Sequence, residues 1–147
     1  MILLCGTATS VFAGQPPVRL EGAWIRALPP TQSVTAAYVS IRNGGQESIA
    51  LAGASVEGAG RVEIHTTREV DGLMRMEQLT TLEISPGQTR SLAPGGAHFM
   101  VFELDAMPRE GESRELCLLF VGGEKLCTQA PVRKSAEQGS HHDHQHH

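Results

Sequence analysis

The chain has 147 residues, of which 40% are hydrophobic, a size and composition that suit one domain with a sizeable core. Only 4% of the residues are aromatic, so we expect Val, Leu, Ile and Ala to form most of that core. The net charge is -4, and no group of Lys and Arg residues is interleaved with aromatic residues. These features exclude nucleic acid as an expected partner.

The first thirteen residues are apolar and small, and they end in Val11-Phe12-Ala13, which resembles a small-x-small cleavage site. We interpret residues 1–13 as a signal peptide, although no Lys or Arg precedes the apolar run; the alternative is an irregular start of the chain. A run of about a dozen residues is too short to span a bilayer, so no transmembrane anchor is predicted. Cys5 would leave with this segment. We therefore expect a periplasmic or otherwise extracytoplasmic protein. As a separate expectation, the protein is predicted to be a monomer.

From Gln15 onward the chain shows short strand patterns separated by turn residues, and no stretch has a helical period over eleven residues. Strands are expected at 18–27, 34–42, 49–56, 61–67, 114–121 and 124–130. Turn residues stand at 29–30, 43–45, 71–72, 85–87, 93–96 and 122–123. Turn signals at such short intervals indicate an all-β fold, a sandwich or a barrel.

Every histidine outside the C-terminal tail, and three of the five methionines, lie between residues 61 and 102. A strand has a period of two, so the apolar Val62 and Ile64 take one face and His65 takes the other face, together with Glu63. We therefore expect His65 to point away from the core.

The same period groups the other candidate side chains of this stretch. Met74 and Met76 share a face opposite Leu73 and Arg75. In the segment 98–102, His98 and Met100 share one face, and Phe99 and Val101 take the other. Each segment thus presents an imidazole or a thioether along a single face.

Two imidazoles and two or three thioethers, with no carboxylate or thiolate among the candidate ligands, form a soft and neutral donor set that suits Cu(I). Thioethers are poor zinc ligands, and a blue-copper site requires a Cys that this stretch lacks. The alternative is that the methionines fill gaps in the core and the histidines are ordinary surface residues. The prediction therefore depends on the whole set of residues.

Cys117 and Cys127 lie on the two arms of the last predicted hairpin, each five residues from Gly122. A loop centred on Gly122 would place them opposite each other, whereas a two-residue turn at Gly122-Gly123 would point them to opposite faces. An oxidising compartment favours a disulfide, and closing so short a loop would add roughly 2 to 3 kcal/mol. The alternatives are two buried small hydrophobic residues, or thiols that serve as extra copper ligands.

Residues 133–147 are polar and cannot bury a core, so we expect a disordered tail. Its last seven residues hold five imidazoles and one carboxylate: His141, His142, Asp143, His144, His146 and His147. This set suits Cu(II), Ni(II) or Zn(II). A purification tag is usually an unbroken run of histidines, and Asp143 and Gln145 interrupt this one. We therefore favour a native tail that gathers metal, including Cu(II).

The spacing of His65, ten residues, Met76, twenty-one residues and then His98-x-Met100 resembles the H-x10-M-x21-H-x-M signature of the PCu(A)C periplasmic copper chaperones. The resemblance covers residues 20–104. Its other matching segments are Ala23-Trp24-Ile25-Arg26, the strand and turn at 38–43, Val62-Glu63-Ile64-His65, the segment 71–76 and the segment 94–100. One departure is that Thr66 and Thr67 stand where many members carry a Met. Met74 could substitute for that residue, but a packing role is favoured for it.

The resemblance implies a cupredoxin-like Greek-key fold over residues 18–132, with His65, Met76, His98 and Met100 as Cu(I) ligands. It also implies a chaperone, not an enzyme, that delivers copper to a respiratory oxidase subunit or to its assembly factor. His98 and Met100 follow Gly95-Gly96 at a strand entrance, and His65 precedes a loop expected at 66–71. At least three ligands would then lie near strand ends, open to the ligands of a partner.

Two other functional classes remain open. One is an enzyme or electron carrier on a cupredoxin-like frame, but the stretch has no Ser/His/Asp set, no paired carboxylates near its histidines and no Cys. The other is a secreted β-sandwich that stores or buffers metal through its tail without specific transfer.

Overall fold

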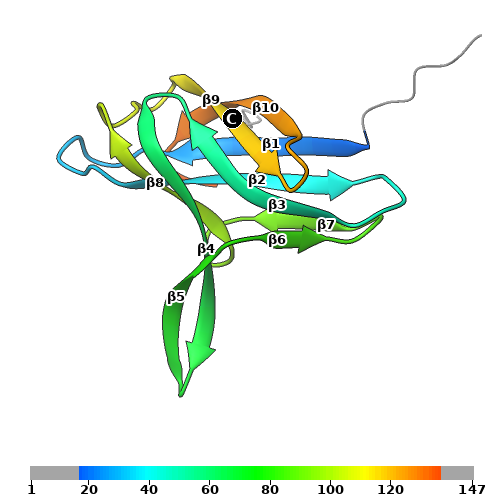
Figure 1. The fold of residues 1–147 in the computed structure, drawn as a ribbon. Coiled ribbons are helices and arrows are strands. Elements are labelled where there is room, and N and C mark those ends of the chain that lie inside the picture. Colours follow the sequence, from blue (N-terminus) through cyan, green and yellow to red (C-terminus); the bar gives the residue numbers. More distant parts are fainter. Residues whose placement is uncertain (1–16, 137–147) are drawn as a thin grey trace, which may run out of the picture.

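The computed structural model describes residues 17–136, which form ten β-strands and no α-helix (Figure 1). The strands are β1 (Val18–Arg26), β2 (Thr35–Asn43), β3 (Ile49–Val56), β4 (Ala59–Val70), β5 (Leu73–Leu79), β6 (Leu82–Ile84), β7 (Thr89–Leu92), β8 (His98–Leu104), β9 (Ser113–Phe120) and β10 (Lys125–Arg133). The all-β prediction is confirmed. The predicted signal peptide at 1–13 and the tail histidines at 141–147 lie outside the described residues. Within residues 17–136, no helix is long and apolar enough to cross a membrane.

The strands curl around one core. Their hydrogen-bonded order is β5-β4-β8-β2-β1-β10-β9-β3-β6, and β7 pairs with β2 beside this path. The pairing of β1 with β10 is parallel, and the other pairings are antiparallel. Ile64 in β4 and Ile84 in β6, near opposite ends of the path, belong to the same buried cluster. The two ends of the path therefore share one apolar interior.

Strand β8 separates the core from an outer face. Phe99 and Val101 are fully buried, and the residues that alternate with them, His98 and Met100, are only partly buried. Ile64 of the neighbouring β4 is also buried, and His65 beside it is only partly buried. The alternation is as predicted: His65 lies on the face away from Ile64, and His98 and Met100 share the face opposite Phe99 and Val101.

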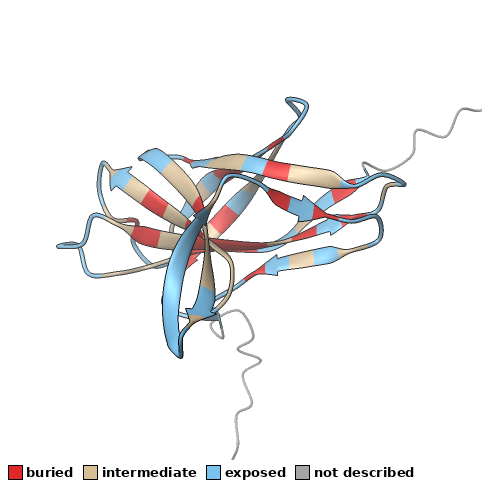
Figure 2. Ribbon diagram, turned by 60° about the horizontal axis from the view of Figure 1, so that its bottom comes forward, coloured by how far each residue is buried: buried red, intermediate tan, exposed pale blue. Residues whose placement is uncertain are grey.

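Strands β4 and β5 form a hairpin that projects from the body of the molecule (Figure 1). No side chain of β5 is buried, and the hairpin is mostly exposed (Figure 2). The expectation of a loop at 66–71 is wrong over residues 66–70, because the ladder between the two strands continues to the pair Val70 and Leu73. Asp71 and Gly72 both have positive φ angles, 52° and 78°, as a two-residue hairpin turn requires.

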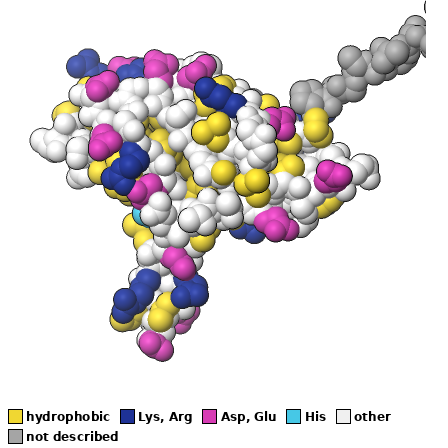
Figure 3. Space-filling view, in the orientation of Figure 1, with side chains coloured by type: hydrophobic (Ala, Val, Ile, Leu, Met, Phe, Trp, Pro, Cys, Tyr) yellow, Lys and Arg dark blue, Asp and Glu magenta, His cyan; other side chains and the backbone are white. Residues whose placement is uncertain are grey.

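The position of this hairpin also corrects the packing role favoured for Met74. Its side chain is 64% exposed, and that of Met76 is 59% exposed. Both residues lie where the hairpin has left the core, so no buried gap is available for them to fill. The space-filling view shows hydrophobic, basic and acidic side chains together on the projecting hairpin (Figure 3).

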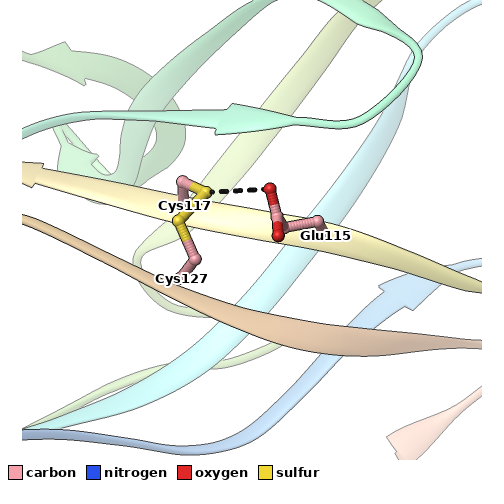
Figure 4. A group of neighbouring side chains, drawn as sticks. All are labelled: Glu115, Cys117 and Cys127. Carbon is pink, nitrogen blue, oxygen red and sulfur yellow. Dashed lines mark hydrogen bonds between the residues drawn. A yellow bond between two sulfur atoms is a disulfide. The ribbon is translucent and has the colours of Figure 1, made fainter.

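The last hairpin is closed by a disulfide between Cys117 in β9 and Cys127 in β10 (Figure 4). The two residues are direct partners in the antiparallel register, so the loop is centred on Gly122 and the predicted disulfide is confirmed. Gly122 and Gly123 have positive φ angles, which is why a glycine pair is suited to this loop. Glu115 Oε1 lies 3.5 Å from Cys117 Sγ. Because the sulfurs are bonded to each other, they are not free thiols that could serve as copper ligands.

Candidate metal centre

Two histidines face each other across adjacent strands. The register of β4 and β8 pairs His65 with His98 and Glu63 with Met100, and the two imidazole centroids are 6.0 Å apart. Residues that are direct partners in an antiparallel pair project from the same face of the sheet. Two imidazoles and one thioether therefore share the outer face of these two strands.

Met76 lies on this face as well, but on the projecting hairpin. His65 is the partner of Gln78, and Met76 is the partner of Thr67, one alternation further from the body. Met76, His98 and Met100 line one pocket of about 460 Å³. His65 does not line this pocket, but it lies across from His98. The structure thus brings three of the four predicted ligands to one pocket and places the fourth beside it.

The hydrogen bonds of the two imidazoles leave one nitrogen of each available. His98 Nδ1 lies 2.9 Å from the carbonyl oxygen of Gly96, which can only accept, so Nδ1 donates and Nε2 keeps its lone pair. His65 Nε2 lies 2.7 Å from Glu63 Oε2, so Nε2 donates to the carboxylate. His65 Nδ1 is then buried without a hydrogen-bond partner. A buried nitrogen with an unused lone pair, close to another imidazole and to thioethers, fits a soft metal ion.

Glu63 is a neighbour of the candidate ligands that has no role in the predicted donor set, although the period of two places it on the face of His65. The hydrogen bond from His65 holds the pKa of the Glu63 carboxyl below its usual range, Arg61 acts in the same direction, and partial burial opposes both. Arg61 Nη1 pairs with Glu63 Oε1, and the Arg61 guanidinium lies 4.2 Å from the ring centroid of Phe102. Glu63 is therefore an anion held between an arginine and a histidine.

The wall of the pocket next to β8 includes Arg26 of β1 and Ala36 and Tyr38 of β2. Trp24 and Tyr38 are cross-strand partners with ring centroids 4.5 Å apart, and Arg26 lies over both rings. Burial raises the pKa of Tyr38, and the Arg26 charge partly opposes this effect. Ala36 of β2 pairs with Met100, which joins this wall to the ligand side. In the sequence, Trp24 and Arg26 stand out only as part of the resemblance over residues 20–104.

Comparison with solved structures relates this fold to PCuAC domains. The copper-bound PCuAC domain from PmoF2 is 19% identical, with a TM-score of 0.66, over 80% of this chain and 93% of that chain. The apo PCuAC domain from PmoF1 is 24% identical, with a TM-score of 0.67, over 80% and 94% of the two chains. Apo-DR1885 from Deinococcus radiodurans is 30% identical, with a TM-score of 0.62, over 92% and 95%.

The fold is that of a cupredoxin-like β domain of the PCuAC type, as predicted. The profile of the family described as "Putative lipoprotein LpqE-like" matches residues 18–132, and the chain belongs to this family. A curated relative, "Putative lipoprotein Lxx21020" from Leifsonia xyli subsp. xyli (strain CTCB07), is 29% identical over 117 residues. That match spans 79% of this chain and 69% of the relative.

Proposed function

We propose that the protein is an extracytoplasmic carrier that binds Cu(I) through His65, Met76, His98 and Met100 and passes it to another protein. The observation that carries this proposal is the shared outer face, on which the two histidines are cross-strand partners and His65 Nδ1 is buried without a partner. Imidazole and thioether are soft, neutral donors, which is the set that Cu(I) prefers.

The donor set also suits a carrier better than a permanent store. Thioethers do not form disulfides, so they remain ligands in a compartment where Cys117 and Cys127 are oxidised. Met76 is on an exposed hairpin, so an incoming ligand can replace it without unfolding the core. Exchange of one ligand at a time never exposes a bare ion, and we therefore expect transfer to be faster than dissociation into water.

The comparisons support this proposal through the proteins that they name. Cu(I)-bound DR1885 from Deinococcus radiodurans is 27% identical to this chain, with a TM-score of 0.62, over 84% of this chain and 82% of that one. The lipoprotein names of the family and of its curated relative agree with a location outside the cytoplasm. A respiratory oxidase subunit or its assembly factor is the acceptor that we propose from the resemblance in sequence.

Binding and transfer can be tested in a full-length chain whose five tail histidines are replaced by Ser. We expect this protein to retain tight binding of Cu(I) in competition with a chromophoric chelator. His65→Ala and His98→Ala should each weaken binding by more than about 100-fold, beyond the range of outer-shell changes. X-ray absorption of the loaded protein should show both sulfur and nitrogen scatterers.

Met107→Leu is the matched control for Met100→Leu, because Met107 lies between β8 and β9 and lines a different pocket. We expect only Met100→Leu to weaken Cu(I) binding. Equal losses in both variants would refute the site. Loss of all tight binding when the tail histidines are replaced would instead favour the second candidate, a metal-buffering module whose metal is held by the tail.

A further inference from the structure

Among the described residues that line the pocket of Met76, His98 and Met100, one is charged, Arg26. It follows Trp24 by two residues on β1, and its guanidinium carbon lies 6.0 Å from the Trp24 ring centroid and 5.6 Å from that of Tyr38. Trp24 and Tyr38 are buried, although they do not belong to the main core cluster. Their packed rings support the guanidinium of Arg26. None of the described residues that line the pocket is acidic.

Arg26 is half-buried and has no carboxylate partner among the described residues. Its Nε is buried and makes no hydrogen bond, and no ion pair joins Arg26 to a carboxylate among the described residues. A guanidinium has five N–H donors and stays protonated in proteins, so it cannot remove this deficit by losing a proton. A buried donor without an acceptor is unfavourable and calls for an explanation.

We propose that Arg26 binds a carboxylate, and that during copper transfer this carboxylate is an acidic side chain of the acceptor protein. The second part rests on the proposed function. The planar fork of a guanidinium matches the two oxygens of a carboxylate. Contact with two aromatic rings already orients Arg26, so little side-chain freedom would be lost on binding.

The position of Arg26 links carboxylate binding to copper exchange. Arg26 lines the same pocket as Met76, His98 and Met100. A cation does not coordinate Cu(I), but an acceptor held by its carboxylate at Arg26 has its own ligands next to the thioethers that are to be replaced. The contact would also neutralise Arg26, the one charged side chain among the described residues that line the pocket. It is therefore expected to favour acceptors that carry an acidic residue close to their copper ligands.

The carboxylate site can be tested without copper. In full-length protein labelled with 15N, the Nε–Hε signal of Arg26 is identified by its loss in Arg26→Met. Acetate is then titrated against sodium chloride at equal ionic strength. We expect a saturable shift of the Arg26 signal with acetate and little shift with chloride, while Arg75 on the exposed β5 is unaffected. No shift at Arg26, or the same shift with chloride, would overturn the proposal.

The role in transfer is tested with two synthetic acceptor peptides that share the same Met and His ligands and differ by one Glu or Gln. The Glu peptide should accept Cu(I) from the wild-type protein roughly fivefold faster, as expected for one partly exposed ion pair. This preference should disappear in Arg26→Met, shrink in Arg26→Lys, which keeps the charge without the fork, and persist in Arg75→Met. A preference that persists in Arg26→Met and Arg26→Lys would refute the role of Arg26. Acetate binding without transfer to either peptide would confirm the carboxylate site and refute the proposed carrier function.

Discussion

Glu63 shows how a side chain that need not touch a metal can decide which nitrogen of a histidine is available to it. Its Oε2 accepts from His65 Nε2 at 2.7 Å, and Arg61 holds its other oxygen. A hard carboxylate is a poor ligand for Cu(I), so its expected effect is on the tautomer of His65. His98 is fixed in the opposite sense by the carbonyl of Gly96.

The first prediction concerns this tautomer. At a pH above the range in which histidines are charged, long-range 1H–15N correlation spectra of the metal-free protein should show His65 protonated at Nε2 and His98 protonated at Nδ1. Glu63→Leu should mix the two tautomers of His65 and weaken Cu(I) binding by about 10- to 100-fold. Glu83→Leu, the same change at an exposed position in β6, should do neither. An unchanged His65 tautomer in Glu63→Leu would contradict this role.

The second prediction concerns stability and pH. The pKa of Glu63 is lowered in the folded protein, chiefly by the hydrogen bond from His65, relative to its ordinary value of 4.5 in an unfolded chain. Its contribution is therefore present above that unfolded value, and it is lost as the pH falls through the lower folded value. Urea unfolding at a series of pH values should show wild type more stable than Glu63→Gln near neutrality. The difference should shrink in acid, and a constant difference would be evidence against the assignment.

At the scale of elements, the β4–β5 hairpin is the part of the chain that leaves the core. No residue of its outer strand is fully buried, and only Leu79, at the end of β5, packs against the core. Its turn needs only Asp71 and Gly72 in positive φ conformations. Met74 and Met76 lie on one face of the hairpin, where their cross-strand partners in β4 are Glu69 and Thr67. The hairpin therefore extends the thioether side of the candidate site away from the body of the molecule.

The third prediction separates the two exposed methionines. Met76→Leu should weaken Cu(I) binding by about tenfold or more, the lower limit for changes around a metal site. Met74→Leu should leave the equilibrium affinity unchanged and slow transfer to an acceptor peptide, because Met74 is the next thioether outward on the same face. Leu73→Met, on the opposite face, serves as the control for the face of the hairpin. If Met74→Leu transfers copper at the wild-type rate, the outer part of the hairpin has no role in exchange.

At the scale of the whole molecule, the sequence predicts which face of a strand a side chain takes better than it predicts where strands end and which strands pair. Alternation of Phe99 and Val101 with His98 and Met100 is a local pattern, so the outer face of β8 could be predicted. Residues 66–70 have no apolar alternation, and they form a strand only because β5 pairs with them. The three-residue β6 and the pairing of β7 with β2 likewise depend on contacts between distant segments.

The site was predictable to the same extent. The donor types and their spacing predict His65, Met76, His98 and Met100 as candidate ligands. The face-to-face position of the two histidines follows from the register of β4 and β8. Arg26 is on β1, which pairs with β2, and β2 pairs with β8. Arg26 therefore lies near Met100 only because β8, which is distant in sequence, pairs with β2. No local pattern in the sequence could indicate that its Nε would be buried without a partner.

The fourth prediction compares the tail with the main site. An imidazole must be neutral to bind metal, so affinity should fall as the pH drops through the free histidine pKa of about 6.5. The tail has five histidines and the main site has two, so the tail should lose metal more steeply. Metal content of the full-length chain, followed against pH with and without replacement of the five tail histidines by Ser, measures both parts. If the replacement leaves the steepness unchanged, this division between tail and main site is wrong.

The disulfide between Cys117 and Cys127 has a consequence for the order in which the chain should be oxidised and loaded with copper. While reduced, Cys117 and Cys127 are cross-strand partners beside Glu115, and a thiolate pair is a stronger soft ligand than any thioether. A chain that met copper before oxidation would therefore be metallated at the wrong end of the fold, on β9 and β10. Once the two sulfurs are bonded, the His/Met face is the softest set left among residues 17–136. Oxidation would thus make correct loading depend on the chain first reaching an oxidising compartment.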